Sequence, residues 1–165
     1  MNPLSEKCCL LTFPPEILRH TDPRLPIALR LIHDSFAYME GRITPPSSIR
    51  DLDLAKLAAH TAAGELVVIG DPPVAAMIMQ HKGQALYLGK IAVDITQRGR
   101  GLARQLIVFA TETAKKQGLD TLTLQSRVEL AENHAAFRAL GFVETGHTTH
   151  EGYDKPTSIT FTKTL

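Results

Sequence analysis

The segment that most constrains this chain is residues 91–104, where an apolar run, a glycine-containing turn and a helical pattern follow one another without a break. The apolar run predicts the end of a buried strand, and Gly99 and Gly101 permit a tight turn into the helix. Such a turn directs consecutive backbone amides and the positive end of the helix dipole at one point. Three basic residues add positive charge there: Arg98, Arg100 and Arg104. The segment therefore predicts a pyrophosphate site.

The spacing of this motif differs from that of two common phosphate-binding turns. A P-loop ends in Gly-Lys-Ser or Gly-Lys-Thr, and the chain contains neither sequence. The dinucleotide fingerprint requires a third glycine where this chain has Arg104, and no acidic residue closes the following strand. Two alternatives stay open at this point: a site for another phosphate ligand such as a nucleotide, and a plain helix start with surface arginines.

The remaining pattern predicts strands and helices mixed along one sheet, which is an α+β arrangement. Apolar residues have helical spacing in 27–36, 54–58, 102–114 and 130–140. Ser48 or Asp51 is expected to cap the second helix, with Leu54, Leu57 and Ala58 on its buried face. Gly89 predicts a bulge or bend within its strand. The predicted strands are residues 8–13, 65–69, 74–80, 85–93, 121–124, 142–145 and 158–162.

Two stretches resemble one family. The pattern Arg98-x-x-Gly101-x-Ala103 resembles the R/Q-x-x-G-x-G/A signature of the GCN5-related N-acetyltransferases (GNAT), which cradles the pyrophosphate of acetyl-CoA. Residues 136–142 resemble the family's second helix and its Leu-Gly-Phe turn. The order of strands and helices also agrees, so the resemblance covers most of the 165 residues.

The resemblance implies a fold and an activity. The expected fold is one GNAT-like α+β domain over residues 1–165, with a mixed, mostly antiparallel twisted sheet of six to seven strands and about four flanking helices. The expected activity is acetyl-CoA-dependent N-acetyl transfer to a primary amine, by direct attack of the amine on the thioester. A non-catalytic acyl-CoA-binding domain, sensing or regulatory, is the alternative.

The resemblance also assigns cofactor-binding residues. The strand before the signature should splay from its neighbour, so that the backbone of Ile91, Ala92 and Val93 pairs with the pantetheine arm. The amide near Val93 would stabilise the developing oxyanion of the thioester. The pyrophosphate would be wrapped by Arg98, Gly99, Arg100, Gly101, Leu102, Ala103 and Arg104. The reaction requires no metal.

The chain departs from the family at two positions. Phe137 stands four residues before the glycine of the Leu-Gly-Phe turn, where members often have the tyrosine that protonates the departing thiolate. Leu130 stands where an asparagine commonly contacts the pantetheine. Asn133, one turn before Phe137, either replaces that asparagine at the cofactor or is an ordinary polar helix residue.

The catalytic residues do not follow from the sequence, and three candidates are named. Tyr87 lies where some members have a carboxylate base, although a phenol with a pKa of about 10 is a poor base at neutral pH. His150 and Tyr153 belong to a His-, Gly- and Pro-rich loop that is expected to border the acceptor site. His147 and His150 lack a third metal ligand, so no metal site is predicted. Tyr38 and Glu40 line the acceptor site or form a solvated helix end.

Charge and composition narrow the partners. Lys and Arg number 18 against 17 Asp and Glu, so bulk electrostatics favour neither nucleic acid nor an acidic membrane. The longest apolar runs, 66–69 and 74–79, are too short to cross a bilayer. The adjacent Cys8 and Cys9 cannot form a disulfide framework and fit a reduced, cytoplasmic protein. The expected acceptor is a small-molecule or peptide amine, and the oligomeric state, monomer or homodimer, is left open.

Overall fold

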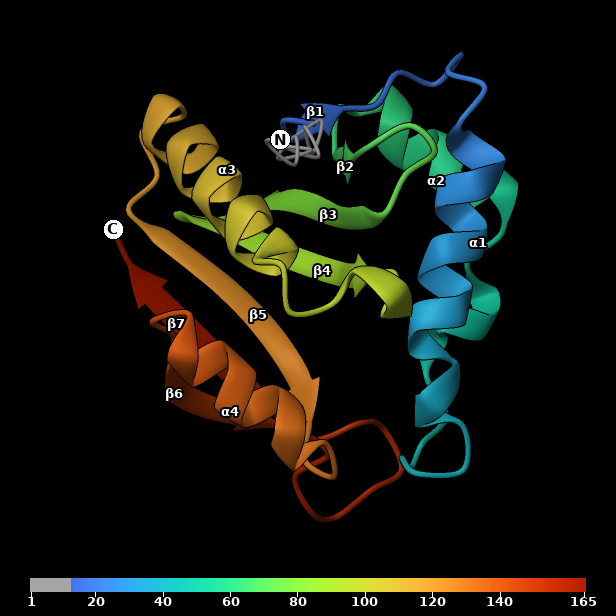
Figure 1. Cartoon of the computed structure of the whole chain (residues 1–165). Coiled ribbons are helices and arrows are strands. Elements are labelled where there is room, and N and C mark those ends of the chain that lie inside the picture. The colour runs from blue at the N-terminus through green and yellow to red at the C-terminus, as the bar shows by residue number, and fades with distance from the viewer. Residues whose placement is uncertain (1–12) are drawn as a thin grey trace, which may run out of the picture.

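One seven-stranded sheet runs through the computed structural model, which describes residues 13–165. Its strand order is β1-β2-β3-β4-β5-β7-β6, and neighbouring strands are antiparallel except for β4 and β5 (Figure 1). The strands are β1 Glu16–Ile17, β2 Leu66–Ile69, β3 Ala75–Lys82, β4 Ala85–Val93, β5 Thr121–Arg127, β6 Val143–Thr148 and β7 Ser158–Thr164. The helices are α1 Leu25–Phe36, α2 Leu54–Ala62, α3 Leu102–Lys116 and α4 Ala131–Ala139. The predicted α+β class with a mixed, mostly antiparallel sheet is confirmed.

The alternation of residues along the central strands builds a core on each face of the sheet. Val67 and Ile69 of β2 pack in one cluster with α3, whereas Leu66 and Val68 pack in the other with α1 and α2. This follows from the two-residue period of a strand, because a strand that is apolar at every position is buried on both faces. Helices therefore cover both sides of β2–β4.

A β-bulge interrupts β4 next to the glycine that predicted an irregularity. Ala92 pairs with Ala76, and Gly89 pairs with Ile78. Two residues of β4, Lys90 and Ile91, therefore lie opposite one residue of β3, Met77. Lys90 is the one non-glycine residue with positive φ in the described part of the chain, at 51°. A bulge resets the alternation of a strand. As a result, Leu86 and Leu88 before it, and Ile91 and Val93 after it, all pack toward α3.

The second helix begins later than predicted. Asp53 caps it by accepting a hydrogen bond from the Lys56 amide at 2.8 Å, so Ser48 and Asp51 are not its caps. Both belong instead to a short 3₁₀ helix, Ser48–Asp51. The predicted burial of Leu54 is also wrong, since 44% of it is exposed. Because the helix begins later, Leu52, which has an extended backbone just before the helix, is buried in place of Leu54.

Two further predictions meet the described residues only in part. The predicted strand at 8–13 lies almost wholly outside them, as do Cys8 and Cys9, and Phe13 belongs to no strand. β1 was not predicted, because it directly follows Pro14 and Pro15, and prolines at such a position usually mark a turn or the end of a strand. Within residues 13–165, no helix combines the length and apolar character needed to cross a membrane.

Candidate active site

The central feature of the molecule is a cleft that opens where β4 and β5 part. These strands pair at only three positions, from Ala85 with Thr121 to Tyr87 with Thr123. Beyond these pairs the two strands diverge toward their carboxyl ends (Figure 1). A cleft of about 1140 Å³ occupies this region, lined by β4, β5, α4, the turn before α3 and the segment that follows α1. The splay that the family resemblance implied is therefore present.

The turn before α3 lies at one end of this cleft. Gly99 and Gly101 have φ of +77° and +78°, a conformation that residues with a Cβ adopt at a cost. The first backbone hydrogen bond of α3 runs from the Gln105 amide to the Gly101 carbonyl. The amides of the preceding turn thus have no acceptor within the helix. Residues of this turn that line the cleft are Arg98, Gly99, Gly101, Leu102 and Ala103.

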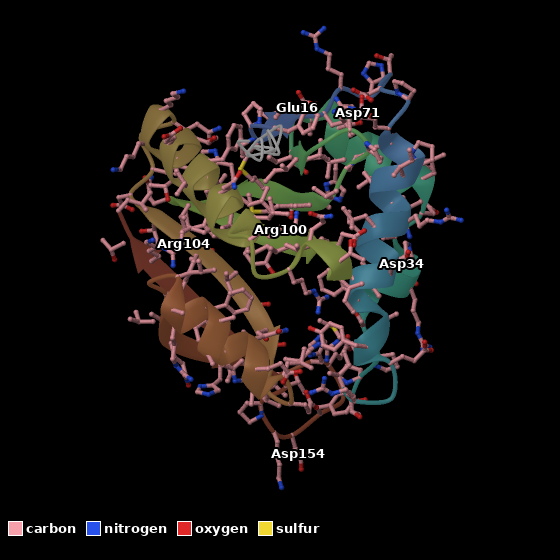
Figure 2. All side chains as sticks on the ribbon, viewed as in Figure 1. Glu16, Asp34, Asp71, Arg100, Arg104 and Asp154 are labelled. Carbon is pink, nitrogen blue, oxygen red and sulfur yellow. The ribbon has the colours of Figure 1, made fainter. Side chains whose placement is uncertain are left out.

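The three arginines of the motif are not equivalent. Arg98 lines the cleft, while Arg100 and Arg104 do not. Arg100 belongs to the turn and Arg104 to the first turn of α3 (Figure 2), and both are exposed. Among the strand residues, Ile91 and Val93 line the cleft, whereas Ala92 is buried against α1 and α2.

Helix α4 supplies the wall opposite β4. Phe137 lines the cleft and lies between two other aromatic rings, with centroids 5.8 Å from Phe161 and 6.4 Å from Phe142. Asn133 also lines the cleft, and its Nδ2 donates to the Tyr38 hydroxyl at 2.9 Å. Leu130, at the asparagine position of the family, is fully buried and lines the cleft at the N-terminal end of α4.

The Asn133–Tyr38 hydrogen bond is one of several contacts that tie residues 38–48, which we call the bridging segment, to the far side of the cleft. Arg42 Nη1 lies 2.7 Å from Glu132 Oε1 on α4. Arg127 Nη2, at the end of β5, donates to the Pro46 carbonyl at 3.2 Å. The bridging segment therefore crosses from the α1 side of the cleft to the β5–α4 side.

Two cationic side chains, Lys90 and Arg127, line this part of the cleft, and the sequence analysis singled out neither. Lys90 Nζ donates to Ser48 Oγ at 3.1 Å. Arg127 Nη1 is fully buried and has no hydrogen-bond partner among the described residues. Burial lowers the pKa of the Lys90 ammonium, the nearby Arg127 charge lowers it further, and Asp51 acts in the opposite direction. The bulge at Gly89 was the available signal, since it fixes where Lys90 points.

A second group of polar side chains lies next to Tyr87 and includes a histidine that the sequence analysis did not name. Tyr87 is paired with Gln80 across the strands, and Gln80 Nε2 lies 3.5 Å from Glu65 Oε2. His60 Nδ1 lies 2.5 Å from the same oxygen, and His60, Gln80 and Tyr87 all line the cleft. Because a carboxylate only accepts, Nδ1 of His60 is the donor in this contact, and in the neutral form of the ring the lone pair would lie on Nε2. His60 closes a helix, so nothing local in the sequence marked it.

The other catalytic candidates are placed differently. Burial raises the pKa of the Tyr87 phenol, which moves it further from use as a base. His150 lines the cleft and its Nδ1 contacts the Thr157 hydroxyl, whereas Tyr153 is 41% exposed and lies outside the lining. The loop between β6 and β7, with Asp154 at its tip, extends beyond the sheet (Figure 2).

The remaining polar candidates lie outside the cleft. His147 Nε2 lies 3.2 Å from Glu144, and Glu40 pairs with Arg50. Residues 13–165 contain no group of three His, Cys, Asp or Glu side chains arranged to hold a metal ion.

Comparison with known proteins gives a matching family model and a relative that matches part of the chain. The family model described as the acetyltransferase (GNAT) family matches residues 32–142. N-alpha-acetyltransferase 30 of Saccharomyces cerevisiae is 30% identical over 57 residues, which is 34% of this chain and only 32% of that protein's length.

Two solved structures share the fold. A GNAT-family acetyltransferase from Listeria monocytogenes has a TM-score of 0.69 and 20% identity, covering 93% of this chain and 95% of its own. The PaiA N-acetyltransferase of Thermoplasma acidophilum, solved in complex with coenzyme A, has a TM-score of 0.75 and 13% identity, covering 93% and 99%. At these identities the likeness concerns the fold.

Proposed function

The chain belongs to the GNAT family of acetyltransferases, and from that premise we propose that it transfers the acetyl group of acetyl-CoA to a primary amine. In this reaction the amine nitrogen attacks the thioester carbonyl carbon. A carbon–nitrogen bond forms, the carbon–sulfur bond breaks, the CoA thiolate leaves and the amine gives up a proton.

The observation that carries the proposal is the cleft between β4 and β5 with the glycine turn at its end. Its volume of about 1140 Å³ is slightly above the usual range of ligand sites, about 300–1,000 Å³, and is large enough for a cofactor arm and an acceptor together. The amides before Gln105 and the Arg98 guanidinium suit a pyrophosphate. The facing edges of β4 and β5 beyond their three pairs suit an extended pantetheine arm.

The residues of this chain would divide the binding between backbone and side chain. Ile91 and Val93 line the cleft and leave their backbone for the arm, while Ala92 points into the opposite core. The arginines and glycines of the turn, from Arg98 to Arg104, would hold the pyrophosphate, with Arg98 best placed because it lines the cleft. Phe137 and Asn133 would contact the arm from α4.

The proton of the attacking amine needs an acceptor, and we assign that role to His60. Its Nδ1 proton is held by Glu65, so its Nε2 lone pair is free to take a proton. Tyr87 is less suitable because burial raises the pKa of its phenol. The thiolate can leave without the tyrosine that Phe137 replaces, since a thiol of pKa about 8.5 is a good leaving group.

Cofactor binding is tested first, by thermal unfolding with and without acetyl-CoA and with a nucleotide as control. Acetyl-CoA at about one hundred times its Kd should raise Tm by roughly 5–10 °C. Arg98→Ala should weaken acetyl-CoA binding by about tenfold or more, because a charged hydrogen bond is lost. Arg104→Ala is the matched control, with a smaller loss expected because Arg104 lies outside the cleft.

The outcomes separate the alternatives. No rise in Tm at high acetyl-CoA would overturn the proposal, and an equal rise with the nucleotide would favour a different phosphate ligand. A rise with acetyl-CoA but no acetylation of any amine would support the non-catalytic acyl-CoA-binding alternative.

The role of His60 is tested by His60→Ala, which leaves space for added imidazole. We expect kcat to fall about 100-fold or more, with the acetyl-CoA-dependent rise in Tm unchanged. Added imidazole should restore part of the rate, which a merely structural defect would not allow. His81→Ala is the control, since His81 lies outside the cleft. Loss of activity without rescue, or no loss, would remove the assignment.

A further inference from the structure

Lys90 and Arg127, which we call the cationic pair, are two basic side chains that line the cleft. No carboxylate of the described residues forms a salt bridge with either of them. The polar contacts of the two side chains are neutral: Lys90 donates to the Ser48 hydroxyl at 3.1 Å and Arg127 to the Pro46 carbonyl at 3.2 Å. Arg127 Nη1 is buried with no partner among residues 13–165. Proteins normally satisfy a buried guanidinium N–H, so this one is suited to an acceptor brought by a ligand.

The pair is separate from the turn that suits the pyrophosphate. Lys90 lies in the bulge of β4, and three strand residues, or roughly 10 Å, separate it from the end of that strand. Both side chains contact residues between α1 and α2, on the side of the sheet where Tyr87 and His60 also line the cleft. The pair therefore lines the same cleft as the proposed base, and Lys90 and His60 also line one smaller hollow together.

The electrostatics of the pair favour an anion. Burial and the nearby Arg127 charge both lower the pKa of Lys90, because each of them disfavours a positive charge at this position. Asp51 acts on Lys90, whereas Glu129 and Tyr153 act on Arg127, and neither carboxylate forms a salt bridge with the pair among the described residues. An oxyanion between Lys90 and Arg127 would relieve the repulsion and supply acceptors for Nη1.

The bridging segment indicates the size of the acceptor. Its contacts from Tyr38 to Asn133, from Arg42 to Glu132 and from Pro46 to Arg127 cross the cleft next to the pair. We expect a polypeptide to reach Lys90 only by displacing these contacts, whereas a small molecule can enter the cleft alongside them.

We propose that the acceptor is a small primary amine that also carries a carboxylate or phosphate group, and that Lys90 and Arg127 bind this oxyanion. The proposal rests on the proposed acetyl transfer for its amine, while the oxyanion site stands on the pair itself.

The test compares primary amines in matched charged and neutral forms. β-Alanine is paired with β-alaninamide, and O-phosphoethanolamine with ethanolamine, so that the two arms distinguish carboxylate from phosphate. In at least one pair the anionic form should have a kcat/KM about tenfold or more above its neutral partner. Equal or better use of the neutral form in both pairs would overturn the proposal. A short acidic peptide used as well as the preferred small amine would overturn its small-molecule part.

Variants connect the preference to the pair. Arg127→Gln and Lys90→Met should each reduce the preference for the anionic amine to less than about threefold, while the acetyl-CoA-dependent rise in Tm stays unchanged. Lys115→Gln, an exposed change on α3, should alter neither. If Arg127→Gln weakens acetyl-CoA binding instead, the arginine belongs to the cofactor and the proposal is wrong.

A binding measurement distinguishes failure of this site from failure of the enzyme. If no amine is acetylated, calorimetric titration of O-phosphoethanolamine and β-alanine into the CoA-saturated protein shows whether the oxyanion site binds these compounds. Binding that Arg127→Gln abolishes would retain the oxyanion site and remove the catalytic function. Absence of binding to either compound would overturn the oxyanion site.

Discussion

At the scale of single residues, Lys90 combines two unfavourable features in one position. Its φ of 51° costs about 1–2 kcal/mol for a residue with a Cβ, and its ammonium is partly buried beside Arg127. Strain and buried charge of this kind concentrate at functional sites, where a ligand or a reaction uses them. The position therefore agrees with a binding role better than with a purely structural one.

Lys90→Met gives a pH-dependent prediction. The pKa of Lys90 is lowered in the folded protein, so between that value and the ordinary value of about 10.5 the unfolded chain binds more protons. The native protein should therefore gain stability as pH rises through this window, and the variant should lack that gain. We expect the Tm of Lys90→Met relative to the native protein to fall as pH rises from 7 to 10.

Lys115→Met is the matched control for the removal of a lysine, and its Tm difference from the native protein should show a weaker trend. The backbone strain at position 90 is the same with Lys and with Met, so it cancels in the comparison. A Tm difference for Lys90→Met that does not change with pH would contradict the prediction.

At the scale of elements, the segment before α2 shows how a small shift in a helix start changes what faces the cleft. Because Asp53 caps α2, the residues before it form a separate 3₁₀ helix, with Ser47 accepting a hydrogen bond from the Ile49 amide. This 3₁₀ helix carries Ser48, which holds Lys90. Had α2 begun at Ser48 or Asp51, the partner of Lys90 would have been placed differently.

The cap is tested by Asp53→Ala. Loss of the hydrogen bond to the Lys56 amide should lower the free energy of unfolding by about 1 kcal/mol, as at other N-caps, or roughly 2–4 °C in Tm. Asp51→Ala is the matched control, since that side chain caps nothing, and should cost less than half as much. Equal losses in denaturant titrations of the two variants would show that Asp53 is not the effective cap.

At the scale of the whole molecule, the two cores share the same strands. Each of β2 and β3 contributes one set of residues to the cluster under α3 and the alternate set to the cluster under α1 and α2. Neither cluster can be exposed without removing support from the other. We therefore propose that residues 13–165 fold as a single cooperative unit.

Calorimetry tests this proposal. We expect one unfolding transition with an enthalpy of about 0.7 kcal/mol per residue, on the order of 110 kcal/mol for residues 13–165, and agreement with the van't Hoff enthalpy. Acetyl-CoA should move this single transition as a whole. Two transitions, of which acetyl-CoA moves only one, would contradict a single unit.

The sequence by itself determined the features that depend on neighbouring residues. The helical and strand periods, the irregularity at Gly89, the turn with Gly99 and Gly101 and the family resemblance of residues 98–103 are all local. Within residues 13–165 the structure agrees with the elements they predict, apart from the start of α2. The replacement of the family tyrosine by Phe137 was also visible, because a motif fixes its position.

Only the tertiary structure decided which distant side chains meet in the cleft. Tyr38 and Asn133 are 95 residues apart, Pro46 and Arg127 are 81 apart, and Ser48 and Lys90 are 42 apart. These contacts depend on how far β4 and β5 splay and on where the bulge and the helix cap fall, and a shift of one residue turns a strand side chain to the opposite face. Local patterns do not carry that register, because it is set by packing between segments that are remote in the chain.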